Sequence, residues 1–423
     1  MEISIQKYGG SSLADDAQVA AVARRVAQTY AGGNAVVVVV SARGATTDEL
    51  VRSATAVSGA PDPRETDKLL ATGELASAAL LAIALRELDV PAVSLSGPDA
   101  GLRAVGPPGA GVIASIDTGT VRHWLDRGHV VVVAGFQALD DDGAVVTLGR
   151  GGSDTSAVAL AVAHGAPVCE IYTDVRGVAS ADPRVVPGAG LLQRLPAAVM
   201  AEMAFSGARV LHPRSVELAA AHGVDIVVRD SSGLGEGSTI FGGRAEMLDS
   251  DVLEGRAGVV AVTHDEKVTQ VVVEAGRELA DGGARVLQAL ARLEIAVDSV
   301  QWLSHRDAPL RMRFCVTDDA ADEAAAAVRA ELPDDDCVIT LRQDLGRVCA
   351  VGTGLLSRPG LTALGLDALS AVGIPAECVS CSQERTTFLV PRDRVPDSVR
   401  TLHERFDLHD PDTARPDDLC ERS

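Results

Sequence analysis

Apolar runs and helical periodicities alternate along about the first 230 residues of the chain. Four runs rich in apolar side chains predict buried strands, at residues 2–8, 35–40, 130–136 and 168–174. Between them, apolar positions recur every three or four residues and predict helices at residues 15–30, 46–54 and 65–88, the last being one long helix or a helix pair. This alternation favours an α/β fold with a mostly parallel sheet covered on both faces, and it places ligands at the carboxyl ends of the strands.

The C-terminal part of the chain contains an internal repeat. Residues 288–300 and 367–379 align without gaps at an offset of 79 residues. Identical residues stand at the paired positions Ala289/Ala368, Leu290/Leu369, Ile295/Ile374 and Val300/Val379. Both copies have the pattern of a helix that leads into a strand, so the chain repeats a small α+β unit. A glycine- and serine-rich stretch at residues 231–246 is the expected linker.

Composition narrows the class of protein. Of 423 residues, 47% are hydrophobic and 3% aromatic, and the formal net charge is −21, which argues against nucleic acid or an anionic membrane as the main partner. The apolar runs are shorter than a membrane span and no signal segment is recognised, so a cytoplasmic protein is expected. The seven cysteines are scattered. Cys378 and Cys381 form a C-x-x-C pair, which we interpret as core thiols pointing to opposite faces of a strand rather than as zinc or redox ligands.

A glycine-rich stretch, "TLGRGGSDTSAVALA" at residues 147–161, has the features of an anion site. Glycines let backbone N–H groups approach a ligand closely, and the helix that follows adds its positive end. Arg150 and Asp154 lie in this stretch as candidate functional side chains. The alternative for Asp154 is an ordinary helix N-cap.

Lys7 is the second candidate. The chain has three lysines, Lys7, Lys68 and Lys267, among 38 basic residues, and Lys7 stands just before Gly9 and Gly10 at a predicted strand end. A compact ammonium beside close-approaching backbone suits a phosphate, although a chance surface lysine has the same pattern. The chain lacks the P-loop, dinucleotide, metalloprotease and nucleophile-elbow motifs.

Other polar residues carry less weight. The nine histidines form no metal constellation, and His212 is interpreted as a packing residue. The acidic run at residues 140–142 is typical of a solvated turn. No metal ligand is therefore predicted among the protein side chains.

Several motifs, in this order along the chain, resemble aspartokinase of the amino acid kinase family. They are "KYGGSS" (7–12), "VVVSARGATTDEL" (38–50), "LATGELASAAL" (70–80), the glycine-rich stretch, "CEIYTDVRGVASADPR" (169–184) and "SGARVLHPRSVELA" (206–219). The C-terminal repeat resembles the paired ACT regulatory domains of that family. The resemblance implies an α/β/α sandwich followed by two α+β, ferredoxin-like ACT domains, the second of which takes a strand from before the first.

The resemblance also implies domain boundaries. The catalytic domain would span residues 1–246 and the first ACT domain residues 263–338. The second ACT domain would combine residues 247–262 with 339–412, leaving a tail at 413–423.

The reaction implied by the resemblance is transfer of the γ-phosphoryl group of ATP to the β-carboxylate of L-aspartate, the first step of the aspartate-family amino acid pathway, with ATP and Mg²⁺ as cofactors. A carboxylate with a pKa of about 4 is already ionised, so catalysis needs positioning and charge neutralisation rather than a general base. By the resemblance, Lys7 bridges phosphoryl oxygens and Asp154 orients Lys7. Arg150 holds the α-carboxylate and Glu74 the α-ammonium. The remaining pocket residues are Ser41, Thr47, Gly151 and Gly152.

On the ATP side, the resemblance implies contacts from Lys7, Gly9, Gly10, Ser11, Thr173, Asp174, Asp182, Arg184 and Arg209. The chain departs from the family pattern at Arg176 and Ala179, where aspartate or proline and then tyrosine are usual. Arg209 replaces a usual lysine, and the two cations are not equivalent at a phosphate. These departures bear on ATP affinity.

The ACT repeats of the family bind lysine or threonine. The second repeat retains a version of the effector loop, with Ser357, Pro359, Gly360 and Thr362 as weak candidates. In the first repeat the corresponding residues 275–290 lack a Pro-Gly pair, and Trp302 stands near the expected polar pair. We therefore expect weakened feedback, a specialised pathway, and a homodimer or heterotetramer through the ACT domains. A silent amino-acid-binding regulatory protein and a kinase for a related small amino acid are the alternatives.

Overall fold

The computed structural model describes residues 2–232, 235, 237–242, 258–275, 282–303, 310–332 and 337–409. The chain divides into two compact units. The first comprises residues 1–179, 191–205 and 209–255, and the second residues 180–190, 206–208 and 256–423. Each unit has its own sheets and core.

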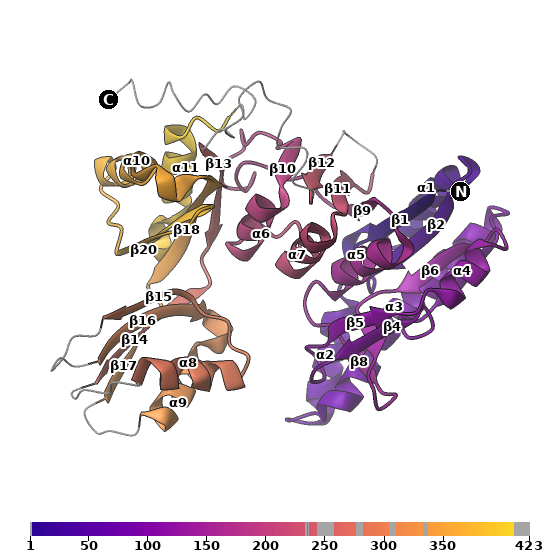
Figure 1. The fold of residues 1–423 in the computed structure, drawn as a ribbon, viewed down its shortest axis with the longest axis horizontal. Coiled ribbons are helices and arrows are strands. Elements are labelled where there is room, and N and C mark those ends of the chain that lie inside the picture. Colours follow the sequence, from indigo (N-terminus) through magenta and orange to yellow (C-terminus); the bar gives the residue numbers. More distant parts are fainter. Residues whose placement is uncertain are drawn as a thin grey trace. The chain divides into compact units, whose positions relative to one another are not determined.

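The first unit contains an eight-stranded sheet in the order β10-β12-β11-β9-β1-β2-β6-β3 (Figure 1). The strands are β1 (Ile3–Tyr8), β2 (Ala35–Val40), β3 (Ala92–Leu95), β6 (Val130–Ala134), β9 (Val168–Thr173), β10 (Arg194–Pro196), β11 (Asp225–Asp230) and β12 (Ser238–Phe241). All neighbours pair in parallel except β11 and β12. The predicted buried strands and the mostly parallel sheet are confirmed.

Helices cover both faces of this sheet, as continuous apolar strands require. Val36, Val38 and Val40 of β2 share a core with helices α1 (Asp16–Ala31) and α3 (Pro63–Glu87). Successive strand side chains alternate in direction, so the intervening valines face the opposite side, where α5 (Gly152–His164) packs against β1, β2 and β9. The remaining helices of the unit are α2 (Thr46–Val57), α4 (Gly119–Leu125), α6 (Ala197–Phe205) and α7 (Pro213–His222).

Helix α3 is one continuous helix of 25 residues, which settles the choice between one helix and a pair. Asp62 caps its start by accepting a hydrogen bond from the Glu65 N–H, and Pro63 fits the first turn. By length and composition α3 could cross a membrane, but 44% of its most apolar window is buried inside the protein. It packs on α1, β3 and β6, as a core helix does.

A smaller sheet, ordered β5-β4-β7-β8, lies beside α3 in the first unit. Its strands are β4 (Leu102–Val105), β5 (Val112–Ile116), β7 (Gln137–Leu139) and β8 (Val145–Thr147). The acidic residues 140–142 form the predicted turn between β7 and β8, closed by a hydrogen bond from Gly143 N to Asp140 O. Strand β8 leads directly into the glycine-rich stretch.

The linker prediction for residues 231–246 was wrong in part. Strand β12 lies inside this range and pairs with β10 and β11. The run of Ser238, Thr239, Ile240 and Phe241 is short but rich in strand-forming residues, and the flanking glycines obscured it. Residues 243–246 lie outside the described residues.

The second unit contains two four-stranded antiparallel sheets, each with two helices on one face (Figure 1). The first sheet, β15-β16-β14-β17, consists of β14 (Val268–Ala275), β15 (Asp298–Leu303), β16 (Leu310–Thr317) and β17 (Cys337–Arg342), with helices α8 (Gly282–Arg292) and α9 (Ala321–Glu331). The second, β13-β18-β20-β19, consists of β13 (Gly258–Asp265), β18 (Leu345–Thr353), β19 (Cys378–Cys381) and β20 (Arg385–Pro391), with helices α10 (Pro359–Ala371) and α11 (Val395–Arg405).

The internal repeat is confirmed by this arrangement. In both copies the helix, α8 or α10, leads into an edge strand, β15 or β19. Strand β13 precedes the first sheet in sequence but pairs with β18 in the second, where it takes the place that β17 has beside β14. The first repeat therefore includes the whole of β17, up to Arg342, and the second repeat includes the whole of β13.

The loop at residues 180–190 contributes to the core of the second sheet. Ala181 and Val186 are buried there with Phe388, Leu402 and Phe406. Ser180 donates a hydrogen bond to Leu408 O at 2.9 Å and lies 2.9 Å from His403 Nε2. A segment that follows β9 in sequence is thus a structural part of the second unit.

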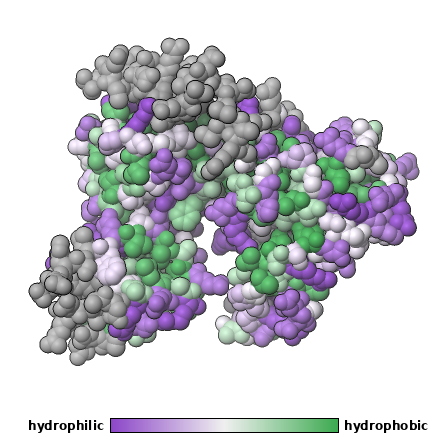
Figure 2. Space-filling view, viewed as in Figure 1, coloured by the Kyte–Doolittle hydropathy of each residue, from purple (hydrophilic) through white to green (hydrophobic). Residues whose placement is uncertain are grey.

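The interpretation of both C-x-x-C cysteines as core thiols was half wrong. Cys378 is buried, whereas Cys381 is exposed. Cys378 packs with Val268, Cys315 and Leu389, whereas the exposed Cys381 lies at the end of β19. Figure 2 shows hydrophobic side chains among hydrophilic ones on the visible face of the molecule, as is usual for a protein surface.

Candidate functional site

A buried ion pair joins the first strand to the glycine-rich stretch. Lys7, near the end of β1, places its Nζ 2.6 Å from Asp154 Oδ1 in the first turn of α5. Both side chains are 11% exposed. Gly151, not Asp154, is the N-cap of α5. Lys7 is therefore not a surface lysine, and Asp154 is not an N-cap, so both alternative interpretations are wrong. The two charged side chains meet at the carboxyl end of a central strand.

Glycines of this stretch, and Gly10 after β1, lie so close to neighbouring atoms that a side chain would not fit. Gly151 has φ +70°, and a Cβ there would collide with the His212 ring. A Cβ on Gly152 would lie 3.0 Å from Phe136, and one on Gly10 would lie 2.5 Å from Ala42 O. His212 thus packs against the glycine loop, as expected. Glycine is the residue that permits these approaches.

Glu74 is a buried carboxylate with one free oxygen. It lies on α3, is 3% exposed, and its Oε1 accepts a hydrogen bond from Ala42 N at 3.0 Å. Its Oε2 is buried without a partner among the residues that the structure describes. Burial raises the pKa of Glu74 to about 7, against the lowering effect of the Ala42 hydrogen bond. An ammonium group would satisfy the free oxygen and restore the charge.

These groups face one cavity of 810 Å³ in the first unit. Its walls include all the predicted catalytic and substrate-binding residues: Lys7, Ser41, Thr47, Glu74, Arg150, Gly151, Gly152 and Asp154. Arg150 is exposed and Thr47 half-buried. The cavity thus places the predicted cations, Lys7 and Arg150, beside the predicted carboxylates, Glu74 and Asp154, which suits an amino acid and a phosphate.

Asp67 also lines the cavity and was not predicted. Its carboxylate accepts hydrogen bonds from Gly109 N at 2.9 Å, Thr147 N at 2.8 Å and the Thr147 hydroxyl at 2.7 Å. A sequence signal existed: Asp67 precedes Glu74 by two helical turns, so two acidic residues fall on a helix face whose other residues are small or apolar.

The predicted nucleotide residues are distributed over both units. Thr173, Asp174 and Arg209 belong to the first unit, Asp182 and Arg184 to the second. Thr173 Oγ1 donates to Asp174 Oδ1 at 3.1 Å. Arg184 Nη2 lies 2.6 Å from Asp182 Oδ2, and this hydrogen bond lowers the pKa of Asp182.

The glycines after β1 belong to the first unit. Gly9 N donates to Tyr172 O at 3.2 Å, and Gly10 O accepts from Gly44 N at 3.0 Å. Ser11 is exposed in the short 3₁₀ turn that follows. Gly10 lines the cavity, whereas Gly9 and Ser11 are not among its wall residues. Among the described residues there is no group of three His, Cys, Asp or Glu side chains that could hold a metal ion.

The effector candidates lie at the start of α10. Ser357, Pro359 and Gly360 are exposed there. Thr362 is half-buried, with its Oγ1 3.4 Å from Thr386 Oγ1 and 3.5 Å from Cys381 Sγ. Pro359 occupies the first turn of α10, where its missing N–H costs nothing.

The start of α8 in the first repeat has different chemistry. A Cβ on Gly283 would lie 2.8 Å from the Trp302 indole, so the ring packs directly on the first turn of the helix. Trp302 is still 43% exposed. Residues 276–281 of the expected effector stretch lie outside the described residues.

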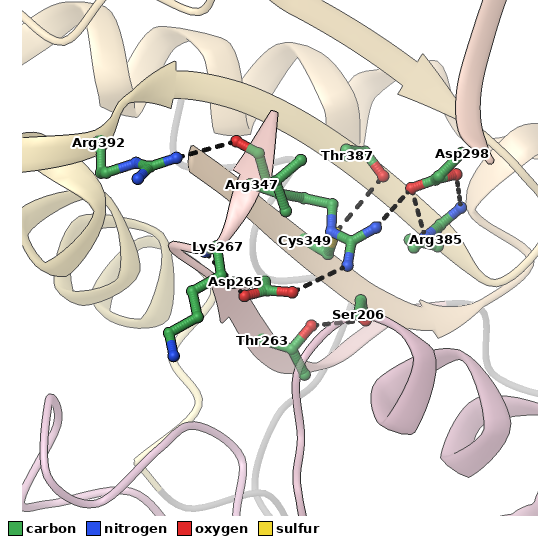
Figure 3. A network of polar contacts seen from close by, with 11 residues as sticks. Ser206, Thr263, Asp265, Lys267, Asp298, Arg347, Cys349, Arg385, Thr387 and Arg392 are labelled. Atoms are coloured by element: carbon green, nitrogen blue, oxygen red, sulfur yellow. Dashed lines mark hydrogen bonds and ion pairs between the residues drawn. The ribbon is translucent and has the colours of Figure 1, made fainter. Parts of the chain in front are cut away.

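A buried ionic network ties the two repeats together (Figure 3). Asp298 of β15 lies 2.7 Å from Arg347 Nη1 of β18 and 2.8 Å from Arg385 Nη2 of β20. Burial alone would raise the pKa of Asp298, but Arg385 and Arg347 together lower it. Arg347 also lies 3.6 Å from Asp265 of β13. The network holds the edge strand of one sheet against three strands of the other.

Comparison with known proteins gives consistent matches. The amino acid kinase family model matches residues 2–230, and an ACT domain model matches residues 348–406. Aspartokinase of Mycolicibacterium smegmatis is 40% identical over 420 residues, covering 98% of this chain and 98% of its own. Aspartokinase of Corynebacterium glutamicum is 40% identical over 418 residues with the same coverage. E. coli aspartokinase III in complex with aspartate and ADP has a similar fold, with a TM-score of 0.76 at 24% identity over 95% of this chain and 99% of its own.

Proposed function

The chain belongs to the aspartokinase family of amino acid kinases, and on this premise we propose that it phosphorylates the β-carboxylate of L-aspartate with ATP. An aspartate Oδ attacks the γ-phosphorus of ATP, and the bond from that phosphorus to the bridging oxygen of ADP breaks. The products are 4-phospho-L-aspartate and ADP. The observation that supports this best is the single cavity that joins Lys7, Asp154, Arg150 and Glu74.

Charge repulsion is the main barrier to this reaction. The nucleophile is ionised at neutral pH, so no general base is needed. Two anions must instead be brought together, and a preorganised cation between them lowers the cost. Lys7 is suited to this task because Asp154 holds its ammonium group at 2.6 Å. Asp154 acts by orienting Lys7.

The cavity can also recognise the amino acid end of the substrate. The Arg150 guanidinium has the planar fork that binds a carboxylate through two hydrogen bonds. The free Oε2 of Glu74 accepts from the α-ammonium. Ser41, Thr47, Gly151 and Gly152 complete the pocket.

The nucleotide would be held by the residues that the family resemblance assigns. These are Gly9, Gly10, Ser11, Thr173, Asp174, Asp182, Arg184 and Arg209, together with Lys7. Mg²⁺ commonly binds substrate phosphates with few protein ligands, so ATP would bring the ion and the ion would neutralise phosphate charge.

The repeats support a proposal on regulation. We propose assembly as a homodimer or heterotetramer through the ACT repeats, with weakened control by lysine and threonine and a role in a specialised pathway. The cytoplasm is the proposed location, in keeping with the free cysteines among the described residues.

An assay of ATP consumption with aspartate, glutamate, homoserine and no acceptor tests the proposal. Aspartate alone should support turnover. Trapping with hydroxylamine should yield the hydroxamate of aspartate, which identifies a carboxyl phosphate. Equal turnover with glutamate would assign a different acceptor, and no turnover with any acceptor would indicate a silent binding protein.

A further inference from the structure

Asp67 connects three separate segments of the first unit. It is 2% exposed on α3, and its two oxygens accept from the Gly109 N–H, the Thr147 N–H and the Thr147 hydroxyl. Gly109 and Thr147 are 42 and 80 residues away along the chain. A buried carboxylate that accepts several hydrogen bonds holds its donors firmly.

The two segments that Asp67 holds also hold each other. Gly111 N donates to Thr147 O at 2.9 Å. Gly149 has φ +72°, and a Cβ there would lie 2.8 Å from Gly109 O. The loop before β5 therefore lies directly against the beginning of the glycine-rich stretch that contains Arg150.

Arg214 also binds both of these segments, but as a hydrogen-bond donor rather than an acceptor. Its Nη1 donates to Leu148 O at 2.6 Å and its Nη2 to Gly111 O at 2.9 Å. Asp67 thus satisfies backbone donors, and Arg214 backbone acceptors, of the same two segments. Neither residue was assigned a role by the sequence or by the proposed reaction.

We propose that Asp67 is a positioning residue that fixes Arg150 relative to Glu74 and so sets the affinity for the amino acid substrate. The proposal rests on the proposed function. Asp67 and Glu74 are seven residues apart on α3, about 10 Å along the helix. One rigid helix therefore carries the ammonium contact directly and anchors, through Asp67, the loop with the carboxylate contact.

The charge and shape of Asp67 are both required. An asparagine has one acceptor oxygen, so its NH₂ group would face at least one of the three donors that Asp67 now accepts from. At least one of the three donors would lose its partner while remaining buried. The loop would shift, but the catalytic pair of Lys7 and Asp154 makes no hydrogen bond to Asp67 among the described residues.

The experiment compares Asp67→Asn with Ser77→Ala. Ser77 is a matched control because it is buried on the same helix and its hydroxyl bonds only to Gly73 O of that helix among the described residues. Asp67→Asn should raise the aspartate KM ~10- to 100-fold, the range for hydrogen bonds to a charged group, and leave the ATP KM within about twofold. Ser77→Ala should change neither. Equal rises in both KM values, or a loss confined to kcat, would overturn the proposal.

A double-mutant cycle with Arg150→Lys tests the route through Arg150. If Asp67 acts by placing the guanidinium, the two losses in aspartate affinity should be markedly less than additive. Full additivity would contradict that route. Should Asp67→Asn fail to fold, Thr147→Val removes one of the three bonds and should give a smaller loss of the same kind.

Hydrogen exchange separates this proposal from the proposed function. In Asp67→Asn without ligands, amides in residues 109–111 and 145–152 should exchange faster than in the wild type, while those of β1 and β2 should not. This readout holds whichever acceptor the enzyme uses. Unchanged exchange in both segments would refute the positioning role of Asp67, whereas lack of aspartate turnover in the wild type would refute only the proposed function.

Discussion

The family resemblance assigns ligands to the cavity of the first unit and, as weak candidates, to the start of α10 in the second repeat, but among the described residues of these two places only the cavity has buried charges. Lys7 and Asp154 are 11% exposed at its wall, and Glu74 is 3% exposed. At the start of α10, by contrast, Ser357 and Gly360 are exposed. At the start of α8 an indole packs on Gly283.

This difference in buried charge shows which part of the molecule accepts an energetic penalty in the empty state in order to bind a ligand. Burying a carboxylate with an unpartnered oxygen is unfavourable, and Glu74 responds with a raised pKa. Such a group stabilises a ligand because it destabilises the empty site. The repeats place their buried charges in the Asp298, Arg347 and Arg385 network instead, where the charges satisfy one another. Buried charge in the repeats thus serves structure.

The largest expected effect comes from removing the cation in the cavity. Lys7→Ala should lower kcat by a factor of ~10² to 10³ and change the aspartate KM much less, because Lys7 acts on charge that develops during transfer. Steady-state kinetics with ATP saturating and aspartate varied measures both constants. Near-normal turnover of the purified variant would remove Lys7 from the mechanism and with it the main contrast between the cavity and the repeats.

A change at Arg150 should affect binding more than turnover. Arg150→Lys retains the charge but loses the planar fork, so aspartate affinity should fall by ~1.5–3 kcal/mol. Calorimetric titration of aspartate gives the value directly. Arg103→Lys, an exposed residue of β4 outside the cavity, is the control and should leave the affinity unchanged. An aspartate affinity of Arg150→Lys equal to that of the wild type would show that Arg150 does not hold the carboxylate.

Glu74 predicts a proton linked to substrate binding. Its pKa of about 7 in the empty site lies above the usual value because burial favours the neutral acid. The folded state therefore binds more protons than the unfolded state between pH 4.5 and about 7, and Glu74 contributes less stability as pH rises through this window. An α-ammonium group reverses the preference, so binding should release up to about one proton near pH 6 and almost none at pH 9.

Titration in buffers of different ionisation enthalpy measures that proton. Glu74→Gln, which cannot ionise, should abolish the buffer dependence and weaken aspartate binding. A buffer dependence that persists in Glu74→Gln would assign the proton to another group. Such a result would leave the burial of Glu74 without a binding role.

The pattern of apolar positions predicted the strands and helices well because it reflects which side chains are buried. The all-valine run of β2 is buried at every position, as its composition indicates. The charged residues nearest to glycines, Lys7 and Asp154, met in space because both lie at the carboxyl side of the same sheet. Asp67 was missed because its partners are backbone groups 42 and 80 residues away, and a backbone N–H has no sequence signature. Strand β12 was missed because its run of strand-forming residues is short and the glycines beside it indicated a linker.

The smallest expected effect concerns lysine and threonine. In the family that the chain resembles, a Pro-Gly loop before the helix and a polar pair on the following strand hold the effector. The first repeat has Gly282 and Gly283 at the helix start, and the indole of Trp302 covers Gly283 at 2.8 Å from the position of a Cβ. An indole has one donor and no acceptor, so it cannot replace an amide that binds both an ammonium and a carboxylate. A buried effector charge without a partner would be costly.

Feedback also requires that the effector bind one conformation better than another, and every lost contact reduces that difference. Millimolar lysine, threonine and both together should therefore change kinase activity by less than about twofold. The measurement is the initial rate at subsaturating aspartate, with calorimetric titration of each effector to separate absent binding from binding without effect. Binding without inhibition would place the loss in the coupling between the units. Strong inhibition by the two effectors together would show that backbone groups at the helix starts suffice for recognition, and the contrast between the cavity and the repeats would then not extend to function.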